Sequence, residues 1–211
     1  MTRSIPIEKI LDDCIIAWAM NGEALRPEQG YPARLVVPGW EGNMWVKWIR
    51  RLEFGDKPYM TREETSKYTD LLRDGKARMF TWVMEAKSVV TSPSPEKPIL
   101  YKGIQQLRGL AWSGKGKIKR VDVSLDGGKN WTTAQLHAPI MSKSLVRFTL
   151  PFEWSGEELL IQSRAIDETG YVQPYIQELQ KIRGKNSIYH NNSIATWLVS
   201  KSGKVDNVRL G

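Results

Sequence analysis

From Met79 onward the chain consists of short runs of β-forming residues separated by turn signals, and this pattern constrains the fold more than any other feature. The runs are FTWVMEAKSVVT, GIQQLRGLAWSG, KIKRVDVSLDGG, LVRFTLPFEWSG and ELLIQSRAIDETG. Their spacing and alternation predict a sandwich of antiparallel strands. Gly127 and Gly128 after Asp126 predict a hairpin turn. The segment TSPSPEKP is too short for a linker and predicts a turn between strands of one sheet. We expect the domain boundary near Phe80.

The beginning of the chain has the apolar spacing of an amphipathic helix. Ser4 is a suitable N-cap, and the apolar residues that follow recur at steps of three and four. The pattern predicts a helix of about four turns that Asn21 and Gly22 end in the left-handed conformation. The apolar positions are Ile7, Ile10, Leu11, Cys14, Ile15 and Trp18.

The rest of the first 80 residues predicts two strands and a long loop. Residues 33–37 form a β-type run closed by proline and glycine, and residues 45–52 are the second candidate strand. Residues 55–77 are polar and charged, which predicts a long surface loop with about one helical turn.

Composition restricts the partners that the chain can have. There are 31 Lys and Arg against 23 Asp and Glu, so the net charge of +8 favours an anionic partner. The cations are scattered and no common nucleic-acid motif is present, so we expect a solvated basic surface and no nucleic acid. No apolar run is long enough to predict a membrane span. The opening MTRSIPIEKILDDC contains acidic residues where a secretory signal would be apolar, so we expect no signal peptide in this sequence.

The residues that most often carry chemistry are few. Cys14 is the single cysteine, which excludes an internal disulfide and a multi-cysteine zinc site. On the predicted helix it is best interpreted as a small buried hydrophobe. His137 and His190 have no further ligand at metal-site spacing, so no metal ligands are predicted. The chain contains no GxSxG, P-loop or GxGxxG motif.

Two cations in the stretch QGYPARLVVPGWEGNMWVKW are more informative. Arg34 falls within a predicted strand and Lys47 within a second apolar run. A cation among apolar neighbours needs a fixed anion, and a guanidinium suits phosphate because its donors match two oxygens. The alternative is that Arg34 pairs with Glu28 or Glu41 while Lys47 points outward. The residues alone leave both interpretations open.

Two ordered sets of motifs resemble the sulfite oxidase family of molybdopterin oxidoreductases. The stretch MNGEALRPEQGYPARLVVPGWEGNMWVKW contains the MNG, GYP, R-x-V-V-P-G and V-K-W motifs of that family's pterin domain in order. The stretches GLAWSGKGKIKRVDVSLDGGKNW and SRAIDETGYVQP resemble its dimerisation domain. Within the family, EQGYPARLVVPGWEGN and PYMTREETSKYTDLL resemble the sulfane dehydrogenase type.

The resemblance implies a mainly β chain with some α structure. Residues 1–80 are expected to be the C-terminal half of an α+β molybdopterin-binding domain, and residues 81–211 an immunoglobulin-like β-sandwich dimerisation domain. In the family a cysteine upstream of the MNG motif holds the molybdenum. Cys14 lies too close to Gln29 to correspond to that cysteine.

The resemblance also assigns roles to single residues. Arg34 corresponds to a cofactor ligand on the phosphate side, and Lys47 to one near the pterin. Gln29 stands where sulfite oxidases have a pterin-contacting histidine, a departure that the sulfane dehydrogenase type shares. Tyr68 is expected to be the active-site tyrosine beside the metal. The alternative for Tyr68 is a loop tyrosine packed on the domain surface.

The function implied is part of a molybdenum-molybdopterin oxidoreductase that oxidises a sulfur substrate, either sulfane sulfur or sulfite. The substrate would be a small sulfur anion or a protein-bound sulfur, and electrons would pass to a c-type cytochrome subunit. A homodimer through the sandwich and a periplasmic location are also implied. The alternative is a catalytically inactive fragment that acts as a dimerisation or interaction module.

Overall fold

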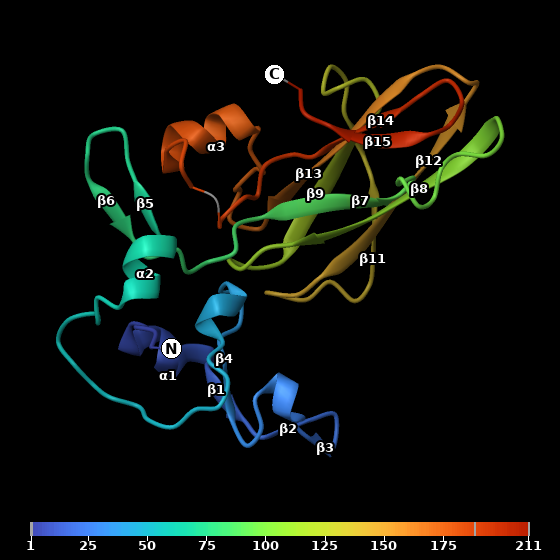
Figure 1. Ribbon diagram of the computed structural model, residues 1–211. Helices are drawn as coiled ribbons and strands as arrows, with labels where there is room; N and C mark the ends of the chain where they lie inside the picture. The colour runs from blue at the N-terminus through green and yellow to red at the C-terminus, as the bar shows by residue number, and fades with distance from the viewer. Residues whose placement is uncertain (1, 188, 211) are drawn as a thin grey trace. The chain divides into compact units, whose positions relative to one another are not determined.

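The structure is a computed structural model, and it describes residues 2–187 and 189–210. The chain forms two compact units. The first comprises Met1–Val83 and Ile182–His190, and the second Met84–Lys181 and Asn191–Gly211. Figure 1 shows their elements by label.

The first unit begins with a helix shorter than the predicted one. Helix α1 (Ile7–Asp13) ends at Cys14, whose backbone is extended. The next three residues form strand β1 (Ile15–Ala17), antiparallel to β4 (Arg34–Val36). The prediction of four helical turns is therefore wrong, because two consecutive isoleucines favour a strand once a partner strand is available. Ser4 does not cap the helix, since its hydroxyl accepts a hydrogen bond from the Tyr59 amide at 2.8 Å.

A second difference concerns the predicted end of that helix. Asn21 and Gly22 do have positive φ angles, of 53° and 82°. They form the turn of a hairpin between β2 (Ala19–Met20) and β3 (Glu23–Ala24). Two consecutive positive φ angles are what a tight two-residue hairpin requires, and an Asn-Gly pair supplies them readily.

The strand predicted over residues 33–37 is confirmed as β4, whereas residues 45–52 form no strand. This second segment runs along β4, and its backbone hydrogen bonds include those from the Leu35 amide to the Val46 carbonyl and from the Ile49 amide to the Ala33 carbonyl. Trp48 has a φ of 52°, which interrupts the extended backbone of a regular ladder.

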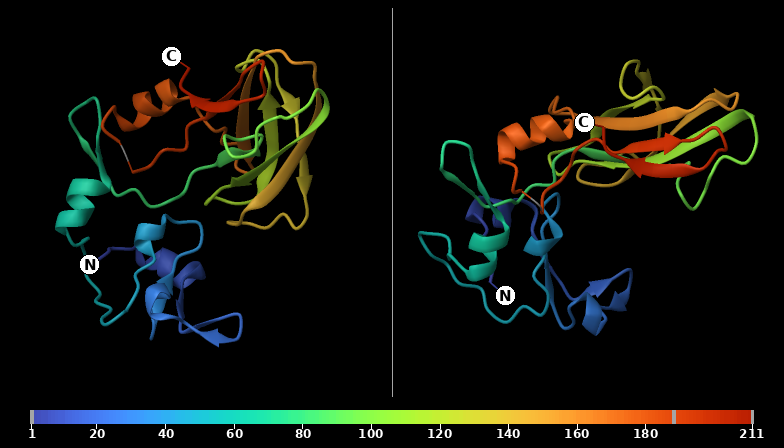
Figure 2. Two further views of the ribbon diagram at one scale, coloured as in Figure 1. Left: turned by 45° about the vertical axis from the view of Figure 1, so that its right-hand side comes forward. Right: turned by 45° about the horizontal axis from the view of Figure 1, so that its top comes forward.

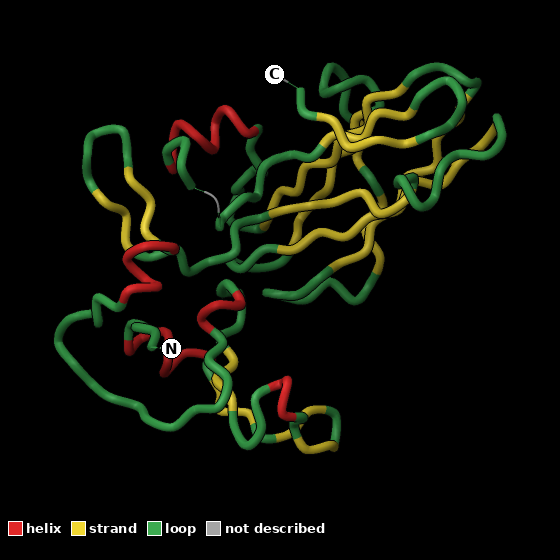
Figure 3. The backbone as a smooth tube through the Cα atoms, viewed as in Figure 1, coloured by secondary structure: helices red, strands yellow, loops and turns green. Residues whose placement is uncertain are grey.

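The remainder of the first unit is largely irregular, as the loop colouring of Figure 3 makes plain. Short 3-10 turns occupy Pro27–Gln29 and Gly42–Met44. The predicted loop contains helix α2 (Arg62–Lys67) and the first strand of the hairpin β5 (Thr69–Leu71) and β6 (Ala77–Met79). The core is small and is built on Val37 and Met44, both fully buried.

The second unit is the antiparallel sandwich that the sequence predicts, and Figure 2 gives two further views of it. One sheet has the strand order β10-β9-β13-β14-β15 and the other the order β11-β12-β8-β7. The strands are β7 (Lys87–Ser92), β8 (Gly103–Trp112), β9 (Ile118–Ser124), β10 (Thr132–Thr133), β11 (Gln135–His137), β12 (Val146–Trp154), β13 (Leu159–Asp167), β14 (Thr196–Val199) and β15 (Val205–Val208). Helix α3 (Ile176–Arg183) follows β13, and the boundary between the units falls within it.

The sandwich core is packed tightly around Phe148 on β12. This side chain is fully buried and lies opposite Gly109 of β8. A Cβ atom at Gly109 would stand 2.1 Å from the Phe148 ring, so only glycine leaves room for the phenyl group. Burial of one such ring contributes about 1.5–3 kcal/mol to folding.

The turn predicted at Asp126 is confirmed between β9 and β10. Gly127 and Gly128 both have positive φ angles there. The Asp126 carboxylate accepts hydrogen bonds from the amides of Lys129 and Asn130, at 3.0 and 2.9 Å. These hydrogen bonds, with those from the side chains of Asn130 and Ser124, lower the pKa of Asp126 from its ordinary 3.8 to about 2.

No helix in the described part of the chain is both long and apolar enough to span a bilayer.

The Asp126 turn generates a prediction about pH dependence. The depressed pKa means that the carboxylate stabilises the fold above its ordinary pKa of 3.8, and that this contribution is lost as the pH falls toward about 2. Asp126→Ala should therefore melt at a lower temperature than the unchanged chain at pH 7, and the gap should close toward pH 2. Thermal melts at several pH values measure it, with Asp56→Ala, at an exposed loop carboxylate, as the control. A gap that does not vary with pH would contradict the assignment.

Candidate cofactor-binding site

Arg34 is placed on β4 by the pairing of that strand with β1, opposite Ala17. Its guanidinium donates to the carbonyl of Gln29 at 3.0 Å and to that of Trp45 at 3.4 Å. The same group lies 5.6 Å from the centre of the Trp45 ring. A guanidinium carries five N–H donors. The Nε atom is buried and has no hydrogen-bond partner.

Lys47 contacts the same turn. Its ammonium donates to the Glu28 carbonyl. Gly30 has a φ of 113°, and a Cβ atom there would stand 2.9 Å from the Lys47 Cβ. Only glycine therefore allows the turn to approach the Lys47 backbone so closely. Arg34 and Lys47 thus both bind carbonyls of the segment 28–29, which brings the two predicted cofactor ligands together.

Gln29 lies between these two contacts. Its side-chain oxygen accepts a hydrogen bond from the Arg26 amide at 2.9 Å, which closes the 3-10 turn. Its backbone carbonyl is the acceptor for Arg34. The carboxamide nitrogen has no hydrogen bond to the described residues and is a donor that a ligand can use.

The two cations have no anionic partner within the described residues, because no carboxylate there lies within ion-pair distance of Arg34 or Lys47. The alternative pairing of Arg34 with Glu28 or Glu41 is not observed. Glu28 offers its carbonyl to Lys47, and the Glu41 carboxylate lies 2.7 Å from His190 Nδ1. The local charge on the turn is therefore positive and unbalanced.

Sequence reasoning missed the two tryptophans that accompany these cations. Trp45 supplies a carbonyl and a ring to Arg34. The Trp48 indole donates to the Pro27 carbonyl at 3.0 Å, and its ring lies 5.9 Å from the Lys47 ammonium. The aromatic residues in W-V-K-W could have indicated these contacts from the sequence, since cations pack favourably on such rings.

Tyr68 lies in a different group of residues. It is half-buried at the C-terminal end of α2. The Arg3 guanidinium lies 4.6 Å from its ring centre, and the Tyr189 ring centre lies 5.1 Å away. Among the described residues, no hydrogen bond or ring contact joins Tyr68 to the turn that holds Arg34 and Lys47. Its role as the active-site tyrosine stays a prediction.

The metal itself has no evident ligand set within residues 2–187 and 189–210. No group of three or more His, Cys, Asp or Glu side chains in that part of the chain could hold a metal ion. Cys14 is half-buried at the end of α1, where it packs against the core of the first unit. The cationic donor set around residues 28–47 fits an anionic group such as a phosphate.

Comparison with known proteins agrees with this fold. Residues 1–63 match the oxidoreductase molybdopterin binding domain, and residues 78–197 match the Mo-co oxidoreductase dimerisation domain. The chain belongs to the sulfite oxidase family of molybdopterin oxidoreductases. This confirms the resemblance and the fold class that the sequence predicts.

Three relatives illustrate the range of the family. The crystal structure of the sulfane dehydrogenase SoxCD from Paracoccus pantotrophus superposes with a TM-score of 0.94 and 62% identity, over 99% of this chain and 54% of that one. Sulfite oxidase of Gallus gallus is 34% identical over 81% of this chain and 40% of its own length. A nitrate reductase of Solanum lycopersicum is 32% identical over 77% of this chain and 21% of its own. The chain spans less than half of these two curated relatives.

The close approach at Gly30 generates the prediction for this site. Gly30→Ala should lower the free energy of unfolding more than Gly22→Ala does. Both substitutions place a side chain at a positive φ, which costs about 1–2 kcal/mol. Only the first also meets Lys47, which adds about 1–3 kcal/mol for overpacking, since no atom lies within 4 Å of a Cβ at Gly22. Urea unfolding measures both losses, and equal losses would contradict the contact.

Proposed function

We propose that the first unit forms one wall of the binding site for a molybdenum-pterin cofactor. Arg34 would bind the cofactor's phosphate, and Lys47 and Gln29 would contact the pterin. The observation that carries the proposal is the pair of cations held on one turn without a carboxylate partner. Arg34 is partly buried, so its charge costs free energy unless an anion balances it, and a guanidinium with unused donors suits a phosphate.

When bound, the cofactor would supply two-electron redox chemistry at its metal. The contribution of this chain is to bind and orient. Carbonyls of the segment 28–29 fix the direction of both cations, and the Trp45 and Trp48 rings lie 5.6 Å from the Arg34 guanidinium and 5.9 Å from the Lys47 ammonium. Positive charge at the site would also attract an anionic substrate.

The particular reaction proposed is oxidation of a sulfur substrate, either sulfane sulfur or sulfite, with electrons passed to a c-type cytochrome. The 62% identity with a sulfane dehydrogenase supports this choice within the family. Homodimer formation through the sandwich and a periplasmic location belong to the same proposal. Tyr68 is retained as the proposed catalytic tyrosine on the basis of its sequence motif.

A second candidate is an interaction module without catalysis. It is favoured by the second unit, whose own core of fully buried residues such as Phe148, Leu107 and Ile161 does not depend on any cofactor. Sedimentation of the purified chain separates the two candidates when it is combined with cofactor analysis. A stable dimer that carries no pterin would support the module.

The test of the first candidate is the pterin content of purified variants. Arg34→Gln should retain about tenfold less pterin per chain than the unchanged protein, because it loses a charge-assisted bidentate contact. Arg50→Gln, at an exposed position nearby in the sequence, is the matched control. Pterin is measured by its fluorescence after release from protein produced in a host that makes the cofactor.

Equal retention in Arg34→Gln and the unchanged chain would contradict the assignment of Arg34. An equal loss in Arg50→Gln would show that general charge, rather than this site, holds the pterin.

A further inference from the structure

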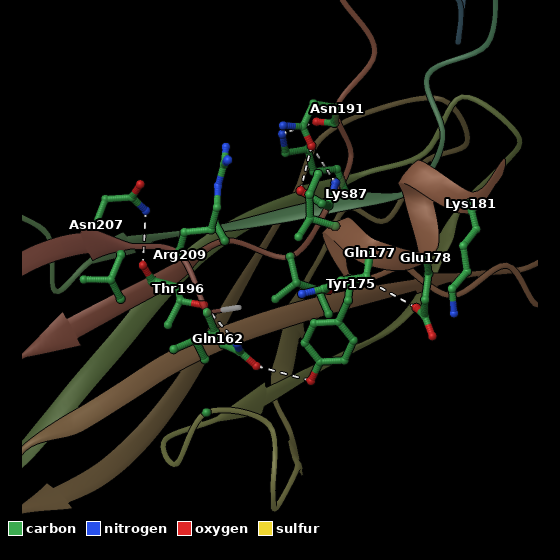
Figure 4. A pocket seen from close by; sticks show the side chains of 17 residues that line it. Lys87, Gln162, Tyr175, Gln177, Glu178, Lys181, Asn191, Thr196, Asn207 and Arg209 are labelled. Carbon is green, nitrogen blue, oxygen red and sulfur yellow. Dashed lines mark hydrogen bonds between the residues drawn. The ribbon is translucent and has the colours of Figure 1, made fainter. Parts of the chain in front are cut away.

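The second unit contains a pocket of about 670 Å³ that has no part in the proposed cofactor site. It is lined by the start of α3, the segment 191–196, strands β14 and β15 and the residues after β15. Figure 4 shows these side chains around the hollow. The volume lies within the range of about 300–1,000 Å³ that small-molecule sites occupy.

Lys87, on β7, is a cation of this pocket that has no anionic partner among the described residues. Its side chain is half-buried, and the ammonium donates to the backbone carbonyl of Asn191. Within residues 2–187 and 189–210, no carboxylate lies within ion-pair distance of it. Burial lowers the pKa of Lys87, because desolvation disfavours the charged form. A partly buried ammonium with unused donors is a natural place for a ligand anion.

The neutral polar groups of the pocket already satisfy one another. The Gln162 amide donates to the Thr196 hydroxyl at 2.9 Å, and the Tyr175 hydroxyl donates to the Gln162 oxygen at 3.4 Å. Asn207 donates to the Thr196 carbonyl at 3.1 Å. Gln162 and Thr196 are buried, so this floor is held in place before any ligand arrives.

The charges that line the pocket are mainly positive. The described lining residues include three cations, Lys87, Lys181 and Arg209, and one carboxylate, that of Glu178. Glu178 accepts a hydrogen bond from the Tyr175 amide at 3.2 Å and so caps the start of α3. In Figure 4, Glu178 lies beside Lys181 and away from Lys87 and Arg209. The Lys87 and Arg209 charges are therefore the ones left for a ligand.

Apolar side chains complete the lining: Ile176, Ile194, Val208 and Leu210. We propose that this pocket binds a small organic anion, with its acidic head at Lys87 and an apolar body against these side chains. A carboxylate and a phosphate ester share the required chemistry. The proposal does not rest on the function of the first unit.

The test measures binding of benzoate and of phenyl phosphate to the 211-residue chain by titration calorimetry at fixed ionic strength. Benzamide is the uncharged probe, and inorganic phosphate is the probe without an apolar body. We expect saturable binding of at least one aromatic anion below about 10 mM. Whichever of the two binds more tightly identifies the preferred acidic head.

Two variants locate that binding. Lys87→Met should weaken it at least about tenfold, because the half-buried charge supplies the contact with the acidic head. Lys119→Met, at an exposed lysine of β9 outside the pocket, should bind as the unchanged chain does. Arg209→Gln is the second pocket variant, and we expect it to weaken the affinity about threefold. It provides the test if Lys87→Met does not fold.

Several results would overturn the proposal. They are absence of saturable binding by both aromatic anions, binding of benzamide as tight as that of benzoate, and binding of inorganic phosphate as tight as that of phenyl phosphate. Unchanged affinity in a folded Lys87→Met, or in Arg209→Gln if the first variant does not fold, would also overturn it.

Discussion

The pairing of β1 with β4 is the constraint on which the candidate site depends. It places Arg34 in register opposite Ala17 and lets the guanidinium reach the Gln29 carbonyl. The 3-10 turn that carries this carbonyl also carries the acceptor for Lys47. Two cations from separate segments therefore converge on a few backbone groups. Carbonyl dipoles orient the charges without neutralising them, which leaves the positive field free for an anion.

The second unit depends on a different interaction, the packing of its two sheets against each other. Strands such as β8 and β12 bury alternate residues, and Phe148 fits against Gly109 only because that residue has no Cβ atom. Its core consists of one cluster of buried side chains from this unit, and its pocket includes residues near the end of the chain. The chain thus combines a sandwich that has an extensive core with a first unit whose small core includes the fully buried Val37 and Met44.

The parts of the fold that local patterns determine were predictable. The sandwich strands, β4 and the Asp126 turn follow from alternation and from residues that favour turns. The first helix was predicted too long, because the spacing of Ile15 fits a helix face and the partner strand that extends it lies about twenty residues further along the chain.

The candidate site was predictable in composition but not in geometry. Arg34 and Lys47 stand out as cations among apolar residues, yet the close approach of Gly30 to Lys47 depends on a chain reversal that no local pattern indicates. The pairing of Glu41 with His190 joins residues 149 positions apart. This contact occupies Glu41, one of the two carboxylates that the sequence offers as partners of Arg34, and only the folded structure reveals it.

The most direct test of this account is the molybdenum-to-chain ratio of the unchanged protein, purified from a host that makes the pterin cofactor and measured by elemental analysis. The account predicts a ratio of about one, because the cations on the 28–29 turn would retain the cofactor through its organic part. A folded chain with a ratio near zero would contradict it.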